Sequence, residues 1–237
     1  ALPIYRLETL TPVLKTLHQI PNQLQHLAQE RETTIRLNVL AASTLVTQAL
    51  ISYKKDHDGL NFQLFQNSQC EDADITVFTR ENFQIPAGNK DRYELFKERI
   101  FLAVPADSPY ASEESVRLKD FAHQDFISLS GSRSIRTICD RYCMQAGFVP
   151  HIIYESDSPD TVKNLIASGL GVGFWPHYTW STDSMEQIRL MPIAEPTCQR
   201  AIILQLHRHA RVQEAVCSFY AFLNRYLRQL KAAEKTG

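Results

Sequence analysis

The sequence predicts an α/β protein of two lobes that are joined by two crossover strands and preceded by a separate linker helix. Strand-like and helix-like patterns alternate from Thr34 onwards, which is typical of mostly parallel sheets covered by helices. The turn VPADSP at residues 104–109 interrupts this alternation and is the predicted crossover. An apolar helix at residues 212–230 can return to the first sheet. This arrangement leaves a cleft between the lobes, and such clefts bind small ligands.

The stretch from Tyr154 to Pro176 shows a strand–helix–strand pattern most clearly. Ser158 is a good N-cap, and the proline after it suits the first helical position, where an N–H would have no partner. Gly169 can adopt the left-handed conformation that ends a helix. Apolar residues then alternate with Gly171 and Gly173, which predicts a strand whose glycines let another segment lie close against one face.

The remaining elements follow from the same two periodicities of apolar residues. Strands are predicted at residues 34–41, 61–65, 74–79, 98–105, 125–131, 151–155, 188–193 and 200–208. Helices are predicted at residues 43–55, 134–147 and 212–230. Only residues 66–73 connect the second strand to the third, whereas a parallel crossover usually contains a helix. We therefore expect the helix at this position to be shortened or lost.

The first 33 residues differ from the rest and predict an amphipathic linker helix. Thr11 is suited to cap it, and Pro12 suits its first turn. Pro21 lies inside the pattern and predicts a kink or a break. The polar residues RETT separate this helix from the first strand. Its apolar stripe packs either on another chain or on its own domain, and the pattern leaves both open.

The composition argues against a nucleic-acid or membrane surface on this chain. Lys and Arg total 25 against 26 acidic residues, so no basic field is expected. No apolar run is long enough to cross a bilayer and no signal peptide is evident, so we expect a cytoplasmic protein that does not contact membranes. The five cysteines are scattered without a CxxC pair, which favours reduced thiols.

Motifs for catalysis or for a cofactor are not found in the sequence. It contains no GxSxG elbow, P-loop or HExxH, and the GLGVG run lacks dinucleotide-binding spacing. Cys139 and Cys143 lie four residues apart on one helix, but two ligands are too few for a metal site. His207 and His209 have no third ligand nearby in sequence, which favours core or surface histidines. We therefore expect no enzyme, no metal and no cofactor beyond a small-molecule effector.

An ordered set of motifs resembles the regulatory domain of LysR-type bacterial transcription regulators. The matching segments are LTP at 10–12, AAST at 41–44, DADITVFT at 72–79, LAVPADSPYA at 102–111, FISLSG at 126–131, QAGFVP at 145–150 and DTVKNLIASGLGVGFWP at 160–176. The last segment is the most specific, and the order agrees from about Leu10 to Leu230.

This resemblance implies two lobes of the type 2 periplasmic-binding-protein-like fold, with an effector in the cleft between them. We expect the end of a wing and the linker helix at residues 1–33, lobe I at residues 34–104 with 207–230, and lobe II at residues 105–206. The family implies a homodimer or homotetramer, and promoter DNA binding through a winged helix-turn-helix that this chain lacks. The alternative is a solute-binding protein of the same bilobal fold, against which the linker helix and the missing signal peptide speak.

The expected effector site is a set of hydroxyl-rich turns at strand ends, together with residues around the cleft. Backbone N–H groups at helix starts and Ser or Thr hydroxyls bind carboxylates or phosphates, so a small anionic metabolite is expected. The candidate residues are Ala42, Ser43, Thr44, Phe78, Thr79, Ser130, Gly131, Ser132, Arg133, Asp157 and Trp175.

Each kind of candidate also has a purely structural alternative. Ser43 and Ser132 could simply cap helices. Arg133, with Arg136, could form a fork for a carboxylate or pair with surface acids. Asp157 is also explained as a charge near a helix N-terminus, and core packing is the alternative for Phe78 or Trp175.

Peroxide sensing is not expected of this chain. Members of the resembled family that sense peroxide use two cysteines flanking the helix before the AG motif. This sequence has Cys143 at the later position but Ser134 at the earlier one.

Overall fold

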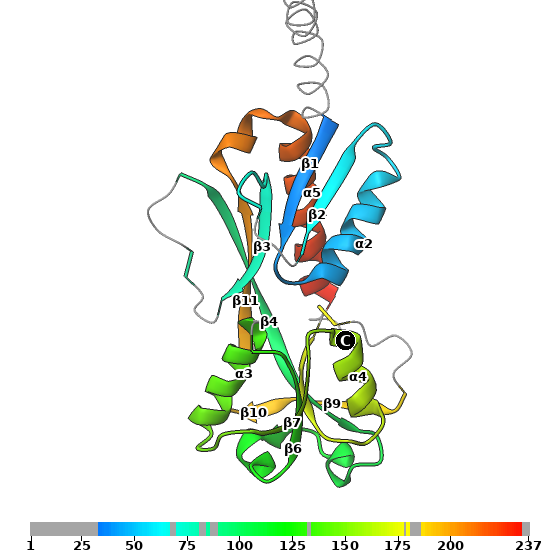
Figure 1. Ribbon diagram of the computed structural model, residues 1–237, viewed down its shortest axis with the longest axis vertical. Helices are drawn as coiled ribbons and strands as arrows, with labels where there is room; N and C mark the ends of the chain where they lie inside the picture. Colours follow the sequence, from blue (N-terminus) through cyan, green and yellow to red (C-terminus); the bar gives the residue numbers. More distant parts are fainter. Residues whose placement is uncertain are drawn as a thin grey trace, which may run out of the picture.

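A computed structural model describes residues 33–66, 70–80, 84–85, 90–131, 134–177, 179–180 and 186–233 of the protein (Figure 1). The predicted linker helix lies outside these residues, as do Ser132 and Arg133.

Two lobes lie one above the other in Figure 1, and two long strands run between them. The strands are β4 (Arg92–Pro105) and β11 (Gln199–Leu206), which pair antiparallel from Arg92 with Leu206 to Arg99 with Gln199. They belong to a seven-stranded sheet of order β2-β1-β3-β11-β4-β8, in which β9 also pairs with β4. The predicted architecture of two lobes joined by two strands is confirmed.

The other strands and the helices alternate along the chain much as predicted. The strands are β1 (Thr34–Val39), β2 (Asn61–Phe65), β3 (Ile75–Arg80), β5 (Val116–Arg117), β6 (Asp125–Leu129), β7 (His151–Ser156), β8 (Gly173–Pro176), β9 (Ile188–Met191) and β10 (Ile193–Glu195). The α-helices are α2 (Ser43–Lys54), α3 (Ser134–Gln145), α4 (Pro159–Ala167) and α5 (Glu214–Ala233). Short 3-10 helices cover Pro109–Ser112, Leu118–Phe121 and Arg208–Val212.

Lobe I, the upper lobe, is built on β1, β2 and β3 and on the upper halves of the crossover strands. Ile35, Leu37 and Val39 alternate along β1 and share one core with α2 and α5. The Tyr53 hydroxyl of α2 donates to the Ser218 hydroxyl of α5 over 2.9 Å and joins the two helices. The last helix therefore returns to the first sheet, as its apolar stripe predicts.

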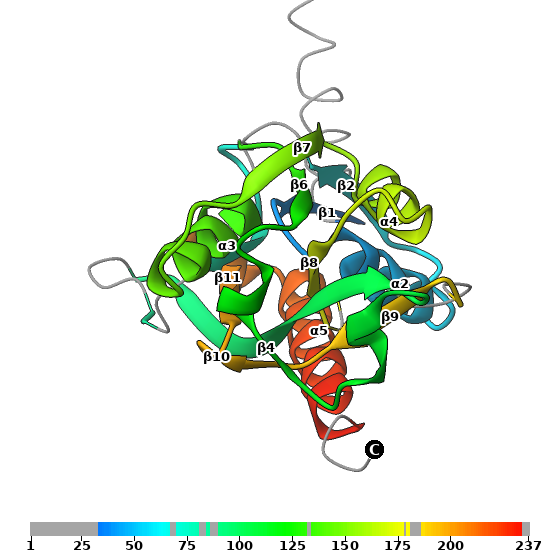
Figure 2. The same cartoon turned by 90° about the horizontal axis from the view of Figure 1, so that it is seen from below.

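Lobe II, the lower lobe, is built around the parallel pair β6 and β7, with α3 and α4 flanking them (Figure 2). Ser158 caps α4 by accepting a hydrogen bond from the Thr161 N–H, and Gly169 after the helix has φ +78°. The chain then crosses to the other side of β6, where Phe126 forms a parallel bridge with Val172. The predicted strand–helix–strand unit is confirmed, with β6 lying between its two strands.

The lobe boundaries differ from those predicted, because both crossover strands contribute to both cores. On β4, Phe96 packs in the lobe I core, whereas Ile100 and Leu102 already pack in lobe II. On β11, Ile202 packs in lobe I, although the predicted boundary placed everything up to residue 206 in lobe II. Each strand therefore changes lobes along its length, and the expected boundaries after residues 104 and 206 lie too late.

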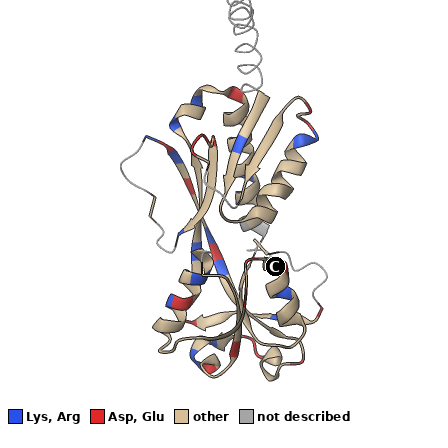
Figure 3. Cartoon of the chain, in the orientation of Figure 1, with Lys and Arg blue, Asp and Glu red and all other residues tan. Residues whose placement is uncertain are grey.

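The connection from β2 to β3 contains no helix in its described residues, 66 and 70–74. This agrees with the short spacing in the sequence and leaves β2 as the edge of the sheet. Among the described helices, none is both long and apolar enough for a bilayer. Figure 3 shows acidic and basic residues interspersed over both lobes, as expected from a net charge of −1.

Replacing Gly171 by alanine should destabilise lobe II. A Cβ at this position would lie 2.6 Å from the carbonyl oxygen of Asp125, which is backbone and cannot move aside alone. We expect Gly171→Ala to lower the free energy of unfolding by about 1–3 kcal/mol in urea denaturation. The matched control is Gly59→Ala, where a Cβ meets nothing within 4 Å. Equal stability of the two variants would contradict this account.

Candidate functional site

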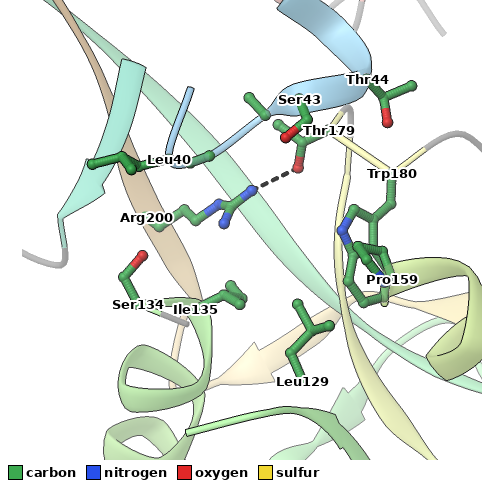
Figure 4. Close-up of a pocket in the computed structure, with 12 residues that line it drawn as sticks. Leu40, Ser43, Thr44, Leu129, Ser134, Ile135, Pro159, Thr179, Trp180 and Arg200 are labelled. Atoms are coloured by element: carbon green, nitrogen blue, oxygen red, sulfur yellow. Dashed lines mark hydrogen bonds between the residues drawn. The ribbon is translucent and has the colours of Figure 1, made fainter. Parts of the chain in front are cut away.

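A cavity of about 80 Å³ lies where the two lobes meet the crossover strands (Figure 4). Lobe I contributes the end of β1 and the start of α2, and lobe II contributes the end of β6 and the starts of α3 and α4. The lining residues are Leu40, Ala41, Ala42, Ser43, Thr44, Leu129, Ser134, Ile135, Pro159, Thr179, Trp180 and Arg200. A ligand here would contact both lobes at once.

The turn from β1 into α2 holds an unusual backbone conformation at the cavity. Ala42 is the N-cap of α2 and has φ 59° and ψ 34°, the left-handed region that a residue with a Cβ seldom adopts. Among the described residues it is the only one besides glycine with positive φ. Ala42 thus holds the N-cap position, and Ser43 is the first helical residue. The capping alternative for Ser43 is therefore wrong, and its side chain lines the cavity instead.

The N-terminus of α2 provides backbone donors on the lobe I side. The first helical hydrogen bond runs from the Val46 N–H to the Ala42 carbonyl, so the N–H groups of residues 43–45 have no partner within the helix. The first turn contains no acidic side chain that would offset the positive end of the helix dipole. This end of α2 therefore favours an anion.

A buried arginine lies beside this helix start. Arg200 on β11 is 4% exposed, and its Nε donates to the Glu98 carboxylate on β4 over 2.6 Å. Its Nη2 donates to the Thr179 hydroxyl over 2.6 Å, as the dashed line in Figure 4 shows. The Thr179 N–H in turn donates to the other Glu98 oxygen over 2.7 Å. Arg200, Glu98 and Thr179, the last through both its hydroxyl and its backbone N–H, form a closed network at the junction of the lobes, and we call it the hinge network.

Lobe II faces the cavity mainly with apolar side chains. Leu129, Ile135 and Pro159 lie on this side, below Arg200 in Figure 4, and Trp180 lies to the right of Arg200. Ser134 is the polar exception.

Two hydrogen-bonded contacts join α3 to other parts of the chain. The hydroxyl of Ser134, at the start of α3, is hydrogen-bonded to the Thr79 hydroxyl at the end of β3 over 2.6 Å. The Tyr142 hydroxyl of α3 also donates to the Gln199 carbonyl and accepts from the Gln199 N–H. Helix α3 is thus tied both to lobe I and to a crossover strand.

The structure brings together part of the predicted site. Ala42, Ser43 and Thr44 line the cavity, and Thr79 lies behind it through its bond to Ser134. Phe78 is not among the lining residues, and the Arg80 guanidinium lies 5.7 Å from the centre of its ring.

The remaining candidates lie away from the lining. Ser130 donates its N–H to the Ser156 carbonyl, and Gly131 and Asp157 are exposed outside the cavity. Trp175 is fully buried in the lobe II core, where its indole N–H donates to the Trp180 carbonyl.

Several lining residues were not predicted from the sequence. They are Leu40, Ala41, Leu129, Ser134, Ile135, Pro159, Thr179, Trp180 and Arg200. One available signal was a charge at the start of an otherwise apolar strand, Arg200 before AIIL. Arg136, considered as a carboxylate fork, instead pairs with Asp140 at 2.7 Å and with Glu155. Its surface-pairing alternative is thus the one that the structure supports.

The histidines near the end of β11 lie in lobe I, away from the cavity. The His207 ring is hydrogen-bonded to the Thr76 hydroxyl over 2.8 Å, and burial lowers its pKa. His209 lies 3.7 Å from Asp74. Among the described residues, no group of three or more side chains could hold a metal ion.

Three cysteines are buried in the lobe II core beside the cavity. Burial raises the pKa of the Cys143 thiol to about 12 and that of Cys198 to about 12. Burial also raises the pKa of Cys139 well above its ordinary value. Cys70 and Cys217 are partly exposed, and all five thiols are free.

Removing the charge of Glu98 should strongly destabilise the protein. In Glu98→Gln the buried Arg200 guanidinium loses its counter-charge, and breaking a buried ion pair costs about 3–5 kcal/mol. The matched control is Glu94→Gln on the same strand, because its partner Arg228 is 62% exposed and such pairs contribute about 0–1 kcal/mol. Urea denaturation of both variants measures the difference, and similar losses would contradict a structural role of the hinge network.

The buried thiols should resist oxidation in the folded protein. At mildly alkaline pH we expect a thiol-exchange reagent to modify Cys70 and Cys217 quickly, and the three buried cysteines only after unfolding, because the thiolate is the reactive form. After peroxide treatment, mass spectrometry of the intact protein should not show the loss of two hydrogens that disulfide formation causes. Rapid disulfide formation in the native protein would refute this expectation.

Comparison with known proteins agrees with the geometry. The family model for the LysR substrate binding domain matches residues 28–228. The uncharacterized HTH-type transcriptional regulator YybE of Bacillus subtilis is 27% identical over 188 residues, which are 76% of this chain and 63% of that protein. The chain therefore spans less than two thirds of that relative's length.

Solved structures show the same fold at low sequence identity. The effector binding domain of QuiR in complex with shikimate is 18% identical, with a TM-score of 0.66 over 83% of this chain and 97% of that one. The Synechocystis PCC6803 CcmR regulatory domain in complex with 2-PG is 15% identical, with a TM-score of 0.70 over 81% and 96%. Because the family model covers most of the chain, this protein belongs to the LysR substrate-binding domain family, the regulatory domain of LysR-type transcription regulators.

Proposed function

We propose that this chain senses a small anionic metabolite in the cavity between its lobes and passes the signal to a DNA-binding module of the whole regulator. One observation carries the proposal: the cavity combines the N-terminus of α2 with the buried guanidinium of Arg200. Both features favour negative charge, and both lie where the lobes meet.

The position of the cavity suits a sensor because its walls come from both lobes. A ligand shifts a conformational equilibrium only if it binds one arrangement better than the other. Thr44 from lobe I and Ile135 or Pro159 from lobe II change their separation when the lobes move. Bound ligand therefore favours the arrangement in which both walls touch it. The neighbours solved with shikimate and with 2-PG support a small molecule as the ligand.

The whole regulator would add parts that the described residues do not include. We propose that residues 1–33 form the linker helix, that the chain assembles as a homodimer or homotetramer in the cytoplasm, and that an N-terminal winged helix-turn-helix binds promoter DNA. The matched relative is a transcriptional regulator, which supports a binding role without catalysis. The same match favours a regulator over a solute-binding protein of this fold.

Thr44→Val should weaken effector binding without unfolding the protein. A thermal-shift screen over organic acids, amino acids and aromatic acids identifies ligands that raise the melting temperature of the natural chain. For those ligands we expect about fivefold to tenfold weaker binding to Thr44→Val, because a lost hydrogen bond costs about 1 kcal/mol.

The matched control is Thr47→Val, one turn along the same helix and outside the cavity lining. Ligands that bind the natural chain, Thr44→Val and Thr47→Val alike would place the effector elsewhere.

A further inference from the structure

We propose that the effector class is a small monocarboxylate with a short apolar tail, with its carboxylate on Arg200 and its tail toward Trp180 and Leu129. This inference rests on the proposed function and narrows it to a ligand chemistry. It follows from the charge of the cavity lining, from the distribution of polar groups over its walls, and from its volume.

The charge of the lining limits the ligand to one negative charge. Among the described residues that line the cavity, Arg200 is the only charged one. Its Nε and Nη2 are used by Glu98 and Thr179, while no described residue accepts a hydrogen bond from Nη1. Glu98 lies directly behind the guanidinium and is itself fully buried. A second negative charge on the ligand would therefore meet the field of Glu98 and find no unpaired cation among the described lining residues, which is costly in a buried site.

Most of the polar groups are gathered at one end of the cavity; the exception, Ser134 of lobe II, is already hydrogen-bonded to Thr79. The hydroxyls of Ser43 and Thr44, the N-terminus of α2 and the guanidinium of Arg200 lie toward lobe I in Figure 4. Arginine binds a carboxylate through directed N–H groups, and hydroxyls supply further donors. One end of the ligand is therefore a hydrogen-bond acceptor.

The opposite end of the cavity is apolar and continues into lobe II. Leu129, Ile135 and Trp180 line the main cavity and also a second space of about 10 Å³. That space, the annex, is walled further by Val162 and Phe174 from the lobe II core, and by Ser128, Cys139 and Arg136, whose guanidinium is already paired with Asp140 and Glu155. An apolar tail in this direction would replace water against apolar side chains, which is favourable.

The volume limits the length of that tail. A space of about 80 Å³ holds roughly five to eight water-sized groups, at about 10–15 Å³ each. This suits short aliphatic acids and excludes an acid that carries a phenyl ring on a spacer. Arg200, Trp180 and Leu129 are then the residues that determine specificity.

The first experiment compares matched ligands on the natural chain by calorimetry and ligand-observed NMR. The probes are propionate, butyrate and isovalerate, each beside its neutral amide, with succinate as the dianion and hydrocinnamate as the oversized acid. We expect isovalerate to bind at least about tenfold more tightly than isovaleramide, succinate or hydrocinnamate, since a hydrogen bond to a charged group contributes about 1.5–3 kcal/mol.

The second experiment tests Arg200 without leaving a buried charge unpaired. The double variant Glu98→Gln with Arg200→Gln removes both charges of the pair, and we expect isovalerate and isovaleramide to bind it with affinities within about threefold of each other. The control is Glu94→Gln with Arg228→Gln, which removes an exposed pair and should keep the preference for the acid. Circular dichroism checks that each variant is folded. If the double variant does not fold, Thr179→Val takes its place. This change releases only Nη2 of Arg200 and should change the ratio of the affinities for isovalerate and isovaleramide.

The remaining outcomes separate this inference from the function on which it rests. The inference is overturned if no monocarboxylate binds, if acid and amide bind equally to the natural chain, or if succinate binds best. Leu129→Phe fills the cavity from its apolar wall without touching its charges. If a ligand of another class binds the natural chain but not this variant, the monocarboxylate class is refuted, whereas the cavity remains the proposed effector site. If every ligand binds Leu129→Phe as tightly as it binds the natural chain, both the monocarboxylate class and the sensing cavity are refuted.

Discussion

The ion pair between Glu98 and Arg200 is the interaction on which the rest of the structure depends. The two residues face each other across the crossover strands β4 and β11, at the point where the chain passes from one lobe to the other. Burying two charges is favourable only when both are paired and further hydrogen-bonded, and Thr179 supplies those bonds to both partners. The pair thereby fixes Thr179 against the strands, and it also places a cation in the wall of the cavity. The structural role of this pair and the ligand contact that we propose for Arg200 meet in one side chain.

The two helices of lobe II that reach the cavity, α3 and α4, are held in different ways. Tyr142 exchanges two hydrogen bonds with the backbone of Gln199, and Ser134 is bonded to Thr79, so α3 is fixed to a crossover strand and to lobe I. Helix α4 packs on β4, β6 and β7 and brings Pro159 to the cavity from the other side. A ligand that fills the cavity thus meets one wall that is fixed by hydrogen bonds and one wall that is held by packing.

Much of the fold could be predicted from the sequence, because apolar periodicity and capping residues act locally. Ser158, Gly169, Gly171 and Gly173 behave as their chemistry predicts. The site was predicted only in part, because it depends on contacts between distant segments. Ala42 to Thr44 follow directly from a strand end, whereas Arg200 reaches the cavity through the antiparallel pairing of β4 with β11 and Thr179 through that of β4 with β8, which no local pattern specifies. Trp175 and Trp180 lie five residues apart, and tertiary packing alone decides which of them faces the cavity.

The sharing of strands between the lobes also affects the order in which the two lobes can fold during synthesis. The chain from the end of β4 to Cys198 holds nearly all of the lobe II core in one contiguous piece. Lobe I, although it begins first, lacks its central strand β11 and its covering helix α5 until the last part of the chain leaves the ribosome. Non-local contacts form only when both partners exist, so lobe II can complete its core first. The edges of β3 and β4 stay unpaired until β11 has been synthesised. The Glu98 carboxylate also lacks its partner Arg200 until β11 is present, so the hinge network is expected to form late in folding.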